Sequence, residues 1–586
     1  MSSINVIKTC NLRTGLVFLL LTLTDLVVVI RLFSTQILQR AYWQGQARAQ
    51  HVGSVDIPAE RGTIYSSDGF PLSMSSFEYN LFINPSEFTG DFDDLEEMFG
   101  MVYSQELSKR SEDQDNTLVD EKREYWKEVL SGKDKLFAFL EKNVSSNTKK
   151  AIEDLNISWV GFIPIPIRYY PEPFIYSPIL GFVGKDREGR EKGYFGVEGF
   201  YDGDLNGVAG YTAQERSAGG SPILFGDYKN IDPVDGSSLK LTIDRTIQNI
   251  SYAILEDSVK KYGAKAGVVL SVNPEKGEIL SLVSYPTFDS SNYEEYYSKD
   301  PKIFINKAIS ESYEPGSVIK ALTMSAAIDL GLVNSSTTMT DSGPVVYSGY
   351  EVDNWDKKHH GQISMEEVLQ LSDNIGAAWV GEKVGDERLY EYFINFGLDS
   401  KLDIDLEGEE SGILRSHSDW QDIDLASAAF GQGISATPLQ VLMSFAAISN
   451  GGVLMKPYVV KALIRDGKEV VNEPKIIRRV ISEGTSLQMI RMLQNAVSGG
   501  EAKYFVSDKY YVAGKTGTAQ ISEKGEYLTD ETNATFVGFL PNYKEFAMLV
   551  KLERPKSSIY ASETAVPVWM EIAEKVAVYL GISPDK

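Results

Sequence analysis

The chain has 586 residues, of which 57 are Lys or Arg and 82 are Asp or Glu, so its formal net charge is −25. This length predicts two or more domains, while 43 % hydrophobic residues argue against wholesale disorder and against a polytopic membrane protein. The negative charge repels a phosphate backbone, so nucleic acid is not an expected partner. With one cysteine, Cys10, and four histidines outside zincin spacing, we expect no disulfide, no metal and no cofactor.

An apolar segment at residues 15–33 follows a short tail, residues 1–14, that contains Lys8 and Arg13. The segment is long enough to cross a bilayer, and no small-residue cleavage site follows it, as a signal peptide would require. The basic tail favours a cytoplasmic N-terminus. Because no second long apolar run follows, we expect a single-pass anchor in the cell membrane with an extracytoplasmic body. Asp25 lies inside the span, where it is either protonated without a role or part of a contact with another membrane protein.

Residues 34–237 form the first predicted domain, and a turn-rich stretch at residues 232–238 marks its end. Its composition changes several times along the chain. The expected elements are a helix over 34–60, a strand–turn–strand unit over 61–72 around Asp68-Gly69, a charged helical lobe over 90–160, and loops with short strands over 161–210.

Residues 238–586 form the second predicted domain. Strand-like segments lie at both of its ends and helical segments lie between them, which predicts one antiparallel sheet packed against helices, an α+β fold. The expected elements are a hairpin over 267–284, helices over 318–330, 364–385, 438–449 and 567–580, and strands over 510–513, 535–539 and 546–552.

The first chemical motif is Ser317-Val-Ile-Lys320, which opens the mostly apolar helix over 318–330. A serine at a helix start is usually only a cap. Here Lys320 lies one turn further on, in a segment that should be buried, and burial lowers the pKa of a lysine so that it can act as a base. The same spacing recurs in settings that indicate chance, at Ser146, Ser237, Ser258 and Ser583.

The second motif is Ser372-Asp373-Asn374, in which a hydroxyl can pass on a proton and an amide can both donate and accept. A polar helix cap would explain it equally well. Asp373 stands at the variable position of this motif and is assigned no role.

The third motif is Lys515-Thr516-Gly517-Thr518, which follows a predicted strand. Its lysine and hydroxyls suit a carboxylate ligand, and its glycine lets a ligand approach the backbone. A phosphate-binding loop would need a glycine where Lys509 stands, so that interpretation fails.

The three motifs occur in the order known from serine β-lactamases and penicillin-binding proteins. Over nearly its whole length the sequence resembles the class B penicillin-binding proteins, the membrane-anchored peptidoglycan D,D-transpeptidases of bacterial cell walls. Pro178 departs from the family pattern, since many relatives have a histidine there. Other segments that carry the resemblance are Arg61-Gly-Thr-Ile64, Arg168-Tyr-Tyr-Pro171, Gly196 to Asp202, Leu205-Asn-Gly207, Gly431 to Gln440 and Asn450-Gly-Gly452.

The resemblance implies a role for each motif residue. Ser317 would be the acylated nucleophile, Lys320 its base, and Ser372 the relay to the leaving D-Ala amine. Asn374 would orient the stem-peptide amide. The terminal carboxylate of the substrate would be held by Lys515, Thr516, Gly517 and Thr518, and the backbone N–H groups of Ser317 and Thr518 would form an oxyanion hole.

The resemblance also implies partners. These are peptidoglycan stem peptides ending in D-Ala-D-Ala, β-lactams as covalent inhibitors, and a polytopic membrane glycan polymerase with other division or elongation proteins. A division role is favoured over elongation. The alternatives are a D,D-carboxypeptidase or β-lactamase-type hydrolase, or an inactive β-lactam-binding scaffold or sensor. A β-lactamase would need neither the anchor nor the first domain, and the three intact motifs argue against an inactive scaffold.

Overall fold

The structure, a computed structural model, describes residues 2–43, 52–85, 88, 92–104, 117–131, 137–157, 159–215, 228–523 and 526–586. Contacts between residues divide the chain into two compact units. One comprises Met1–Glu60 and Gly207–Asp235, and the other comprises Arg61–Asn206 and Gly236–Lys586.

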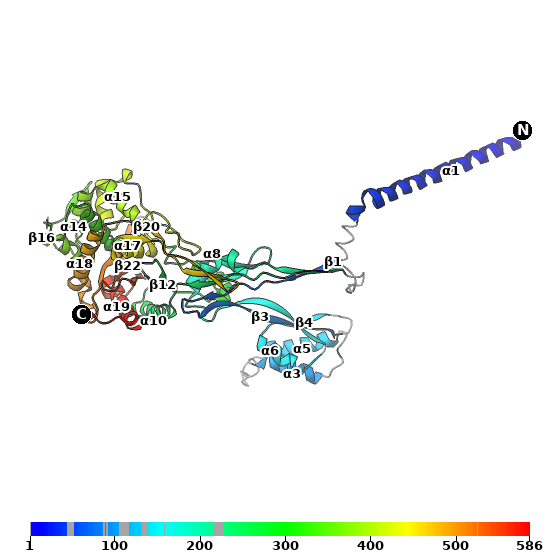
Figure 1. Cartoon of the computed structure of the whole chain (residues 1–586), viewed down its shortest axis with the longest axis horizontal. Coiled ribbons are helices and arrows are strands. Elements are labelled where there is room, and N and C mark those ends of the chain that lie inside the picture. The colour runs from blue at the N-terminus through cyan, green and yellow to red at the C-terminus, as the bar shows by residue number, and fades with distance from the viewer. Residues whose placement is uncertain are drawn as a thin grey trace. The chain divides into compact units, whose positions relative to one another are not determined.

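The first unit begins with α1 (Ser2–Phe33), which a π-helical turn, Ser34–Leu38, continues. Residues Thr14–Leu38 are long and apolar enough to cross a membrane, and none of them is buried. Figure 1 shows this segment as the long helix at the N-terminus. The predicted helix over 34–60 is wrong in its second half: β1 (Val52–Ile57) is a strand. It pairs with β8 (Gly210–Glu215), which pairs with β9 (Tyr228–Ile231). Valine and isoleucine in β1 explain the strand, since β-branched residues favour extended backbone.

In the second unit, β2 (Ile64–Tyr65) and β3 (Pro71–Ile83) form the predicted strand–turn–strand unit, with Gly69 in the turn at φ +87°. Beside β3 lie β4 (Ala138–Val144) and β5 (Val160–Tyr169). The predicted helical lobe is confirmed in part, because it contains strand β4 as well as helices. The helices pack on this sheet around buried side chains such as Phe99 and Trp126 (Figure 1); they are α3 (Phe92–Val102), α5 (Thr117–Ser131) and α6 (Ser146–Glu153).

A buried ion network joins three of the segments that resemble the family. The Glu198 carboxylate accepts from Arg61 Nε and from Arg168 Nε, each at 2.7 Å, and from the Ser73 hydroxyl at 2.9 Å. Burial opposes ionisation of Glu198, but the charges of Arg168 and Arg61 outweigh it and lower the pKa of the carboxyl. The surrounding elements are α7 (Ser177–Leu180), β6 (Phe182–Lys185), β7 (Glu191–Tyr194), α8 (Gly196–Phe200) and α9 (Asp202–Leu205).

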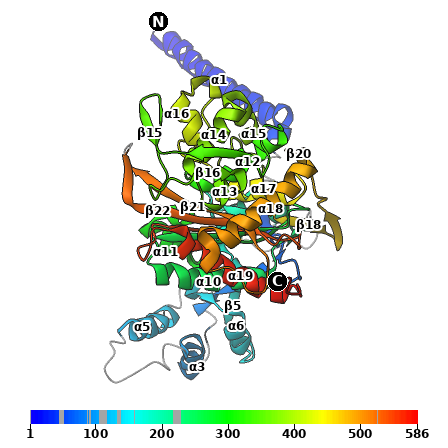
Figure 2. The ribbon, with the colours of Figure 1, turned by 90° about the vertical axis from the view of Figure 1, so that its left-hand side faces the viewer.

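The predicted antiparallel sheet is confirmed, in the strand order β12-β11-β23-β22-β21. Side chains alternate between its two faces: Leu549 belongs to the cluster around α12 and α17, and Val550 to the cluster around α10 and α19. Figure 2 shows helices on both sides of β21 and β22. The bounds are β11 (Ala266–Val272), β12 (Ile279–Tyr285), β21 (Ala513–Glu523), β22 (Glu526–Phe539), β23 (Ala547–Glu553), α10 (Arg245–Tyr262), α12 (Lys320–Asp329), α17 (Pro438–Ser449) and α19 (Ala565–Tyr579).

Strand β10 (Ser238–Leu241) links early and late parts of the second unit. It pairs in parallel with β2 and antiparallel with β18 (Val460–Arg465), which pairs with β19 (Lys468–Val471). The other strands pair two by two: β13 (Thr338–Asp341) with β16 (Gly361–Ser364), β14 (Val345–Tyr347) with β15 (Tyr350–Val352), and β17 (Val453–Met455) with β20 (Ile476–Arg479). The other helices are α11 (Tyr293–Lys299), α13 (Met365–Gln370), α14 (Asn374–Val384), α15 (Asp386–Asn395), α16 (Asp422–Ala429) and α18 (Glu483–Gly499).

Candidate active site

Ser317 lies in a tight 3₁₀ turn, Gly316–Ile319, directly before α12. The prediction that Ser317 opens the α-helix is therefore wrong by one turn, because the α-helix itself begins at Lys320. Gly316 has φ +59°, and its N–H donates to the carbonyl of Gly431 at 3.1 Å. This turn leaves Ser317 partly exposed between buried neighbours. A hydroxyl in that position is accessible to a substrate.

Lys320 is 1 % exposed, and its ammonium is held by the second motif. Its Nζ donates to the carbonyl oxygen of Ser372 at 2.5 Å, to Asn374 Oδ1 at 2.7 Å and to Ser372 Oγ at 3.3 Å. Burial, followed by the nearby charge of Lys515, holds the pKa of Lys320 well below its usual range. The prediction of a buried lysine next to Ser317 is confirmed, and this environment favours its neutral, basic form.

The Ser372-Asp373-Asn374 motif lies between two helices, so the predicted helix over 364–385 is interrupted. A Ser364–Glu367 capping box starts α13, and Asp373 caps α14 by accepting from the N–H of Gly376 at 2.6 Å. Ser372 has φ +56°, a left-handed conformation that costs a non-glycine residue on the order of 1 kcal/mol. That conformation places its hydroxyl within reach of two ammonium groups.

Lys515, in β21, contributes the second of these ammonium groups. Its Nζ donates to Ser372 Oγ at 2.9 Å and to Thr516 Oγ1 at 3.3 Å. Burial lowers the pKa of Lys515, against the opposing charge of Glu501. Thr518 Oγ1 accepts from the N–H of Ala561 at 3.1 Å. Residues separated by almost 200 positions thus form one connected polar group: Lys320, Ser372, Asn374 and Lys515.

Gly517 allows β21 to pack against the turn that carries Ser317. A Cβ at this position would lie 2.7 Å from the carbonyl oxygen of Pro315 and 3.0 Å from Val318 Cγ1. Both distances are shorter than normal contacts, so a larger residue would push the strand away from the turn. The third motif therefore reaches the first by close backbone packing. This is a different reason for a glycine from the predicted one, which was close approach of a ligand to the backbone.

Family models match both predicted domains. Residues 267–574 match the penicillin binding protein transpeptidase domain, and residues 56–241 match the penicillin-binding protein dimerisation domain. The chain belongs to the class B penicillin-binding proteins. This assignment confirms the resemblance and the predicted fold class. The protein is an enzyme that transfers acyl groups, a peptidoglycan D,D-transpeptidase.

Curated relatives match this penicillin-binding protein over almost its whole length. It is 30 % identical to "Stage V sporulation protein D" of Bacillus subtilis, over 99 % of this chain and 88 % of the relative. It is 27 % identical to "Peptidoglycan D,D-transpeptidase FtsI" of Buchnera aphidicola, over 99 % and 97 %. Among solved structures, penicillin binding protein 2X from Streptococcus thermophilus superposes with a TM-score of 0.75 at 21 % identity, covering 91 % of this chain and 83 % of that one.

Sequence reasoning missed three residues that contact the motifs. Asn374 Nδ2 donates to the carbonyl of Asp353 at 2.9 Å, and the N–H of Asn374 donates to Asn354 Oδ1 at 2.8 Å. Glu501 accepts from the Thr516 hydroxyl at 2.8 Å. These residues belong to no recurring motif, and only the fold brings them to the site.

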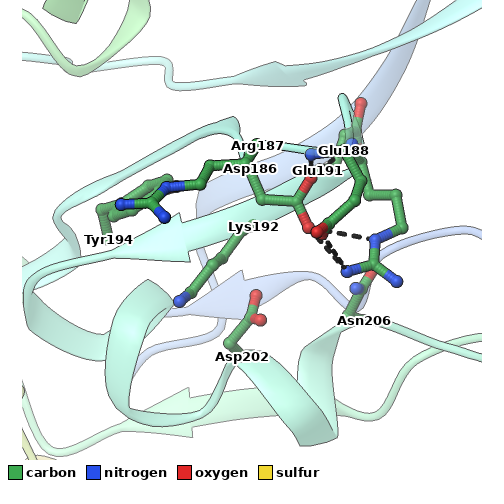
Figure 3. A pocket seen from close by; sticks show the side chains of 9 residues that line it. Asp186, Arg187, Glu188, Glu191, Lys192, Tyr194, Asp202 and Asn206 are labelled. Carbon is green, nitrogen blue, oxygen red and sulfur yellow. Dashed lines mark hydrogen bonds and ion pairs between the residues drawn. The ribbon is translucent and has the colours of Figure 1, made fainter.

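A separate surface hollow of about 580 Å³ lies beside the β6–β7 hairpin (Figure 3). Charges of both signs line it, and among them Arg190 pairs with Asp186 at 2.9 Å and with Glu188 at 2.6 Å. None of the residues of the three motifs lines this hollow. It is therefore separate from the candidate active site.

Proposed function

We propose that this protein cross-links peptidoglycan stem peptides through an acyl-enzyme on Ser317. The observation that carries the proposal is the buried ammonium of Lys320, held by Ser372 and Asn374 in the turn of helix that follows Ser317. A lysine that has lost its proton there can take the proton of the Ser317 hydroxyl. The partial exposure of Ser317 supports its role as the nucleophile.

The reaction has two halves. Ser317 Oγ attacks the carbonyl between the two D-Ala residues, its proton passes to Lys320, and the C–N bond breaks as the leaving D-Ala amine gains a proton through Ser372. The amine of a neighbouring stem peptide then attacks the ester, forms the new amide and frees Ser317. We assign the oxyanion hole to the backbone N–H groups of Ser317 and Thr518. The substrate carboxylate is bound by Lys515 with Thr516, Gly517 and Thr518, and the substrate amide is oriented by Asn374.

The ester of penicillin with Ser317 should persist for many minutes to hours. A cross-linking enzyme keeps water from its acyl-ester until an amine arrives, and we identify no second motif that supplies a glutamate base for deacylation. After excess benzylpenicillin is removed, the mass of the intact protein is followed over time. Loss of the adduct within seconds, with more than one equivalent of drug hydrolysed, would indicate the alternative β-lactamase-type hydrolase.

The rate of acylation should depend on pH in a bell-shaped manner, with both limbs below the ordinary lysine pKa of 10.5. The rate rises as Lys320 loses its proton, and burial and the charge of Lys515 move that step to lower pH. It falls as Lys515 loses the charge that binds the carboxylate, and burial also lowers this pKa. Because the two lysines are neighbours, the limbs report the pair. Stopped-flow acylation by benzylpenicillin measures the profile, and a rate that still rises above pH 10.5 contradicts it.

We further propose that Thr14–Leu38, which includes the predicted span 15–33, anchors the protein once in the cell membrane. Residues 1–14 would then be cytoplasmic and the body extracytoplasmic. We keep the predicted division into domains 34–237 and 238–586. A division role is supported by the relative named FtsI, while the relative named after stage V sporulation supports the second possibility of a spore-related role. In either role we expect a polytopic glycan polymerase as the partner. Asp25 lies inside the span, so its replacement would test whether the span contacts that partner.

A further inference from the structure

An acidic side chain reaches the third motif from a turn that the catalytic proposal does not use. Glu501 opens the 3₁₀ turn Glu501–Tyr504, which follows α18. It is partly buried, and its carboxylate accepts the proton of the Thr516 hydroxyl at 2.8 Å. Thr516 itself is buried and stands next to Lys515 in β21. A carboxylate of the protein therefore lies among the residues that are assigned to a carboxylate of the substrate.

The position of Glu501 is not explained by stability. A negative charge just beyond the C-terminus of α18 meets the negative end of the helix dipole, which disfavours it. Among the described residues, only Thr516 donates a side-chain hydrogen bond to Glu501, and no basic group pairs with it. Lys503, the basic residue of the same turn, lies over the ring of Tyr504 instead, 5.0 Å from the centroid. An acid in so unfavourable a place points to a role at the neighbouring site.

The hydrogen bonds of the two threonines divide their roles. A hydroxyl group has one proton to donate. Thr516 gives its proton to Glu501 and accepts from Lys515 Nζ at 3.3 Å, so it has none left for a substrate. Thr518 accepts from the N–H of Ala561 at 3.1 Å, and within the described residues its own proton has no acceptor. Because Thr518 is also partly exposed, it can donate to an incoming carboxylate.

Glu501 also supplies a negative charge for Lys515. Both side chains contact the Thr516 hydroxyl oxygen, so the two charges lie within about 6 Å of each other, a range over which opposite charges favour each other's ionised form. Burial lowers the pKa of Lys515, and the charge of Glu501 acts in the opposite direction. Glu501 thus helps Lys515 to keep the ammonium that binds a carboxylate.

The other charged groups around Lys515 do not share this position. Lys320 carries the same sign as Lys515, and Asp373 caps α14 through the N–H of Gly376. On the other elements that pack against β21, the charged side chains of Arg491 in α18 and Glu563 in the turn Ala561–Glu563 are exposed. In the described part of the chain, Glu501 is therefore the acid that contacts the third motif.

We propose that Glu501 is a positioning residue for the carboxylate subsite, which holds the Thr516 proton and leaves the substrate carboxylate to Lys515 and Thr518. Thr516 then acts on the carboxylate only through Lys515, whose ammonium it accepts. This inference deepens the proposed function and rests on it, because the subsite matters only if these residues bind the substrate. It gives the two threonines of one motif separate tasks.

The pH dependence of acylation tests the role of the Glu501 charge. Benzylpenicillin carries a carboxylate, and its reaction with full-length protein in detergent is followed by stopped flow. Glu501→Gln keeps the shape and removes the charge, so the falling limb of the profile should move to lower pH by about one unit. Glu501→Asp keeps the charge, and its limb should lie nearer to that of the wild type.

Glu483→Gln is the matched control for this series. It removes an exposed glutamate at the other end of α18, roughly 25 Å from Glu501 by the rise of 17 helical residues. Its falling limb should coincide with that of the wild type. A limb that Glu501→Gln leaves in place, or equal limbs in Glu501→Gln and Glu501→Asp, would overturn the proposal.

The two threonines give a second, independent test. Thr518→Val should raise the benzylpenicillin concentration for half-maximal acylation by at least about tenfold, the usual effect of losing a hydrogen bond to a charged group. Thr516→Val should raise it less, because that hydroxyl has no proton for the carboxylate. If Thr516→Val has an equal or larger effect than Thr518→Val, Thr516 donates to the ligand and the proposed division of roles is wrong.

Failure of this inference differs visibly from failure of the proposed function. Wild-type protein that is never acylated at Ser317 contradicts the proposed function. Wild-type protein that is acylated at Ser317, with a pH profile that Glu501→Gln does not change, contradicts this inference alone. Ligand-free Tm values check that each variant is folded, and the glutamate series and the threonine pair each decide the matter without the other.

Discussion

Replacing Ser317 by alanine should abolish covalent labelling by penicillin. No hydroxyl nucleophile would remain in this turn beside the amine of Lys320, whose pKa is lowered by burial. The change removes one partly exposed hydroxyl, and no hydrogen bond to that hydroxyl is found within the described residues, so the fold should be unaffected. Intact mass spectrometry after incubation with benzylpenicillin should show the unmodified mass alone.

Ser258→Ala is the matched control for this prediction. Ser258 stands three residues before Lys261, the same spacing as Ser317 and Lys320, but it is buried in α10. The control should be labelled like the wild type. An adduct that persists in Ser317→Ala, or one that peptide mapping places on Ser258, would show that the nucleophile is another residue.

Lys320→Arg should reduce the rate of acylation by about 10²–10⁴-fold, the usual contribution of a general base. Arginine retains the charge but does not give up its proton near neutral pH, so it cannot accept the proton of Ser317. Single-turnover acylation by benzylpenicillin measures the effect, and ligand-free Tm values check that the variant is folded.

Lys551→Arg provides the matched control for Lys320→Arg. Lys551 is also a buried lysine, and burial lowers its pKa to about 8, but it lies over the ring of Tyr313, 4.4 Å from the ring centroid. Its replacement should change the rate of acylation less than tenfold. If Lys320→Arg is acylated at a rate near that of the wild type, Lys320 is not the base.

The sequence predicted the sheet, most helices and the residues of the polar group because these depend on local patterns. Leu549 and Val550 face opposite sides of β23 as strand alternation requires, and Ser317, Ser372 and Lys515 each belong to a recognisable motif. Local patterns were less reliable at element ends. The 3₁₀ turn at Ser317 depends on packing against β21, which lies far later in the sequence. The break at Ser372 depends on the contact with Lys320, which lies far earlier in the sequence.

Contacts between residues without a motif could not be predicted. Asn354 reaches Asp341, Asp373 and Asn374 only because the 341–360 segment folds back onto the start of α14. Glu501 likewise meets Thr516 through tertiary structure. Strand β1 was predicted as a helix because the polar residues that follow the span gave no sign of its partner β8, which lies about 150 residues later.

The most direct test of acyl transfer through Ser317 uses a stem peptide ending in D-Ala-D-Ala together with an amine acceptor. Full-length protein in detergent is incubated with both, and the products are weighed by mass spectrometry. The proposed reaction predicts a cross-linked product, one D-Ala released for each cross-link, and no product from Ser317→Ala. A donor that is only shortened by hydrolysis, with no acceptor joined to it, would contradict transpeptidation and favour the carboxypeptidase alternative.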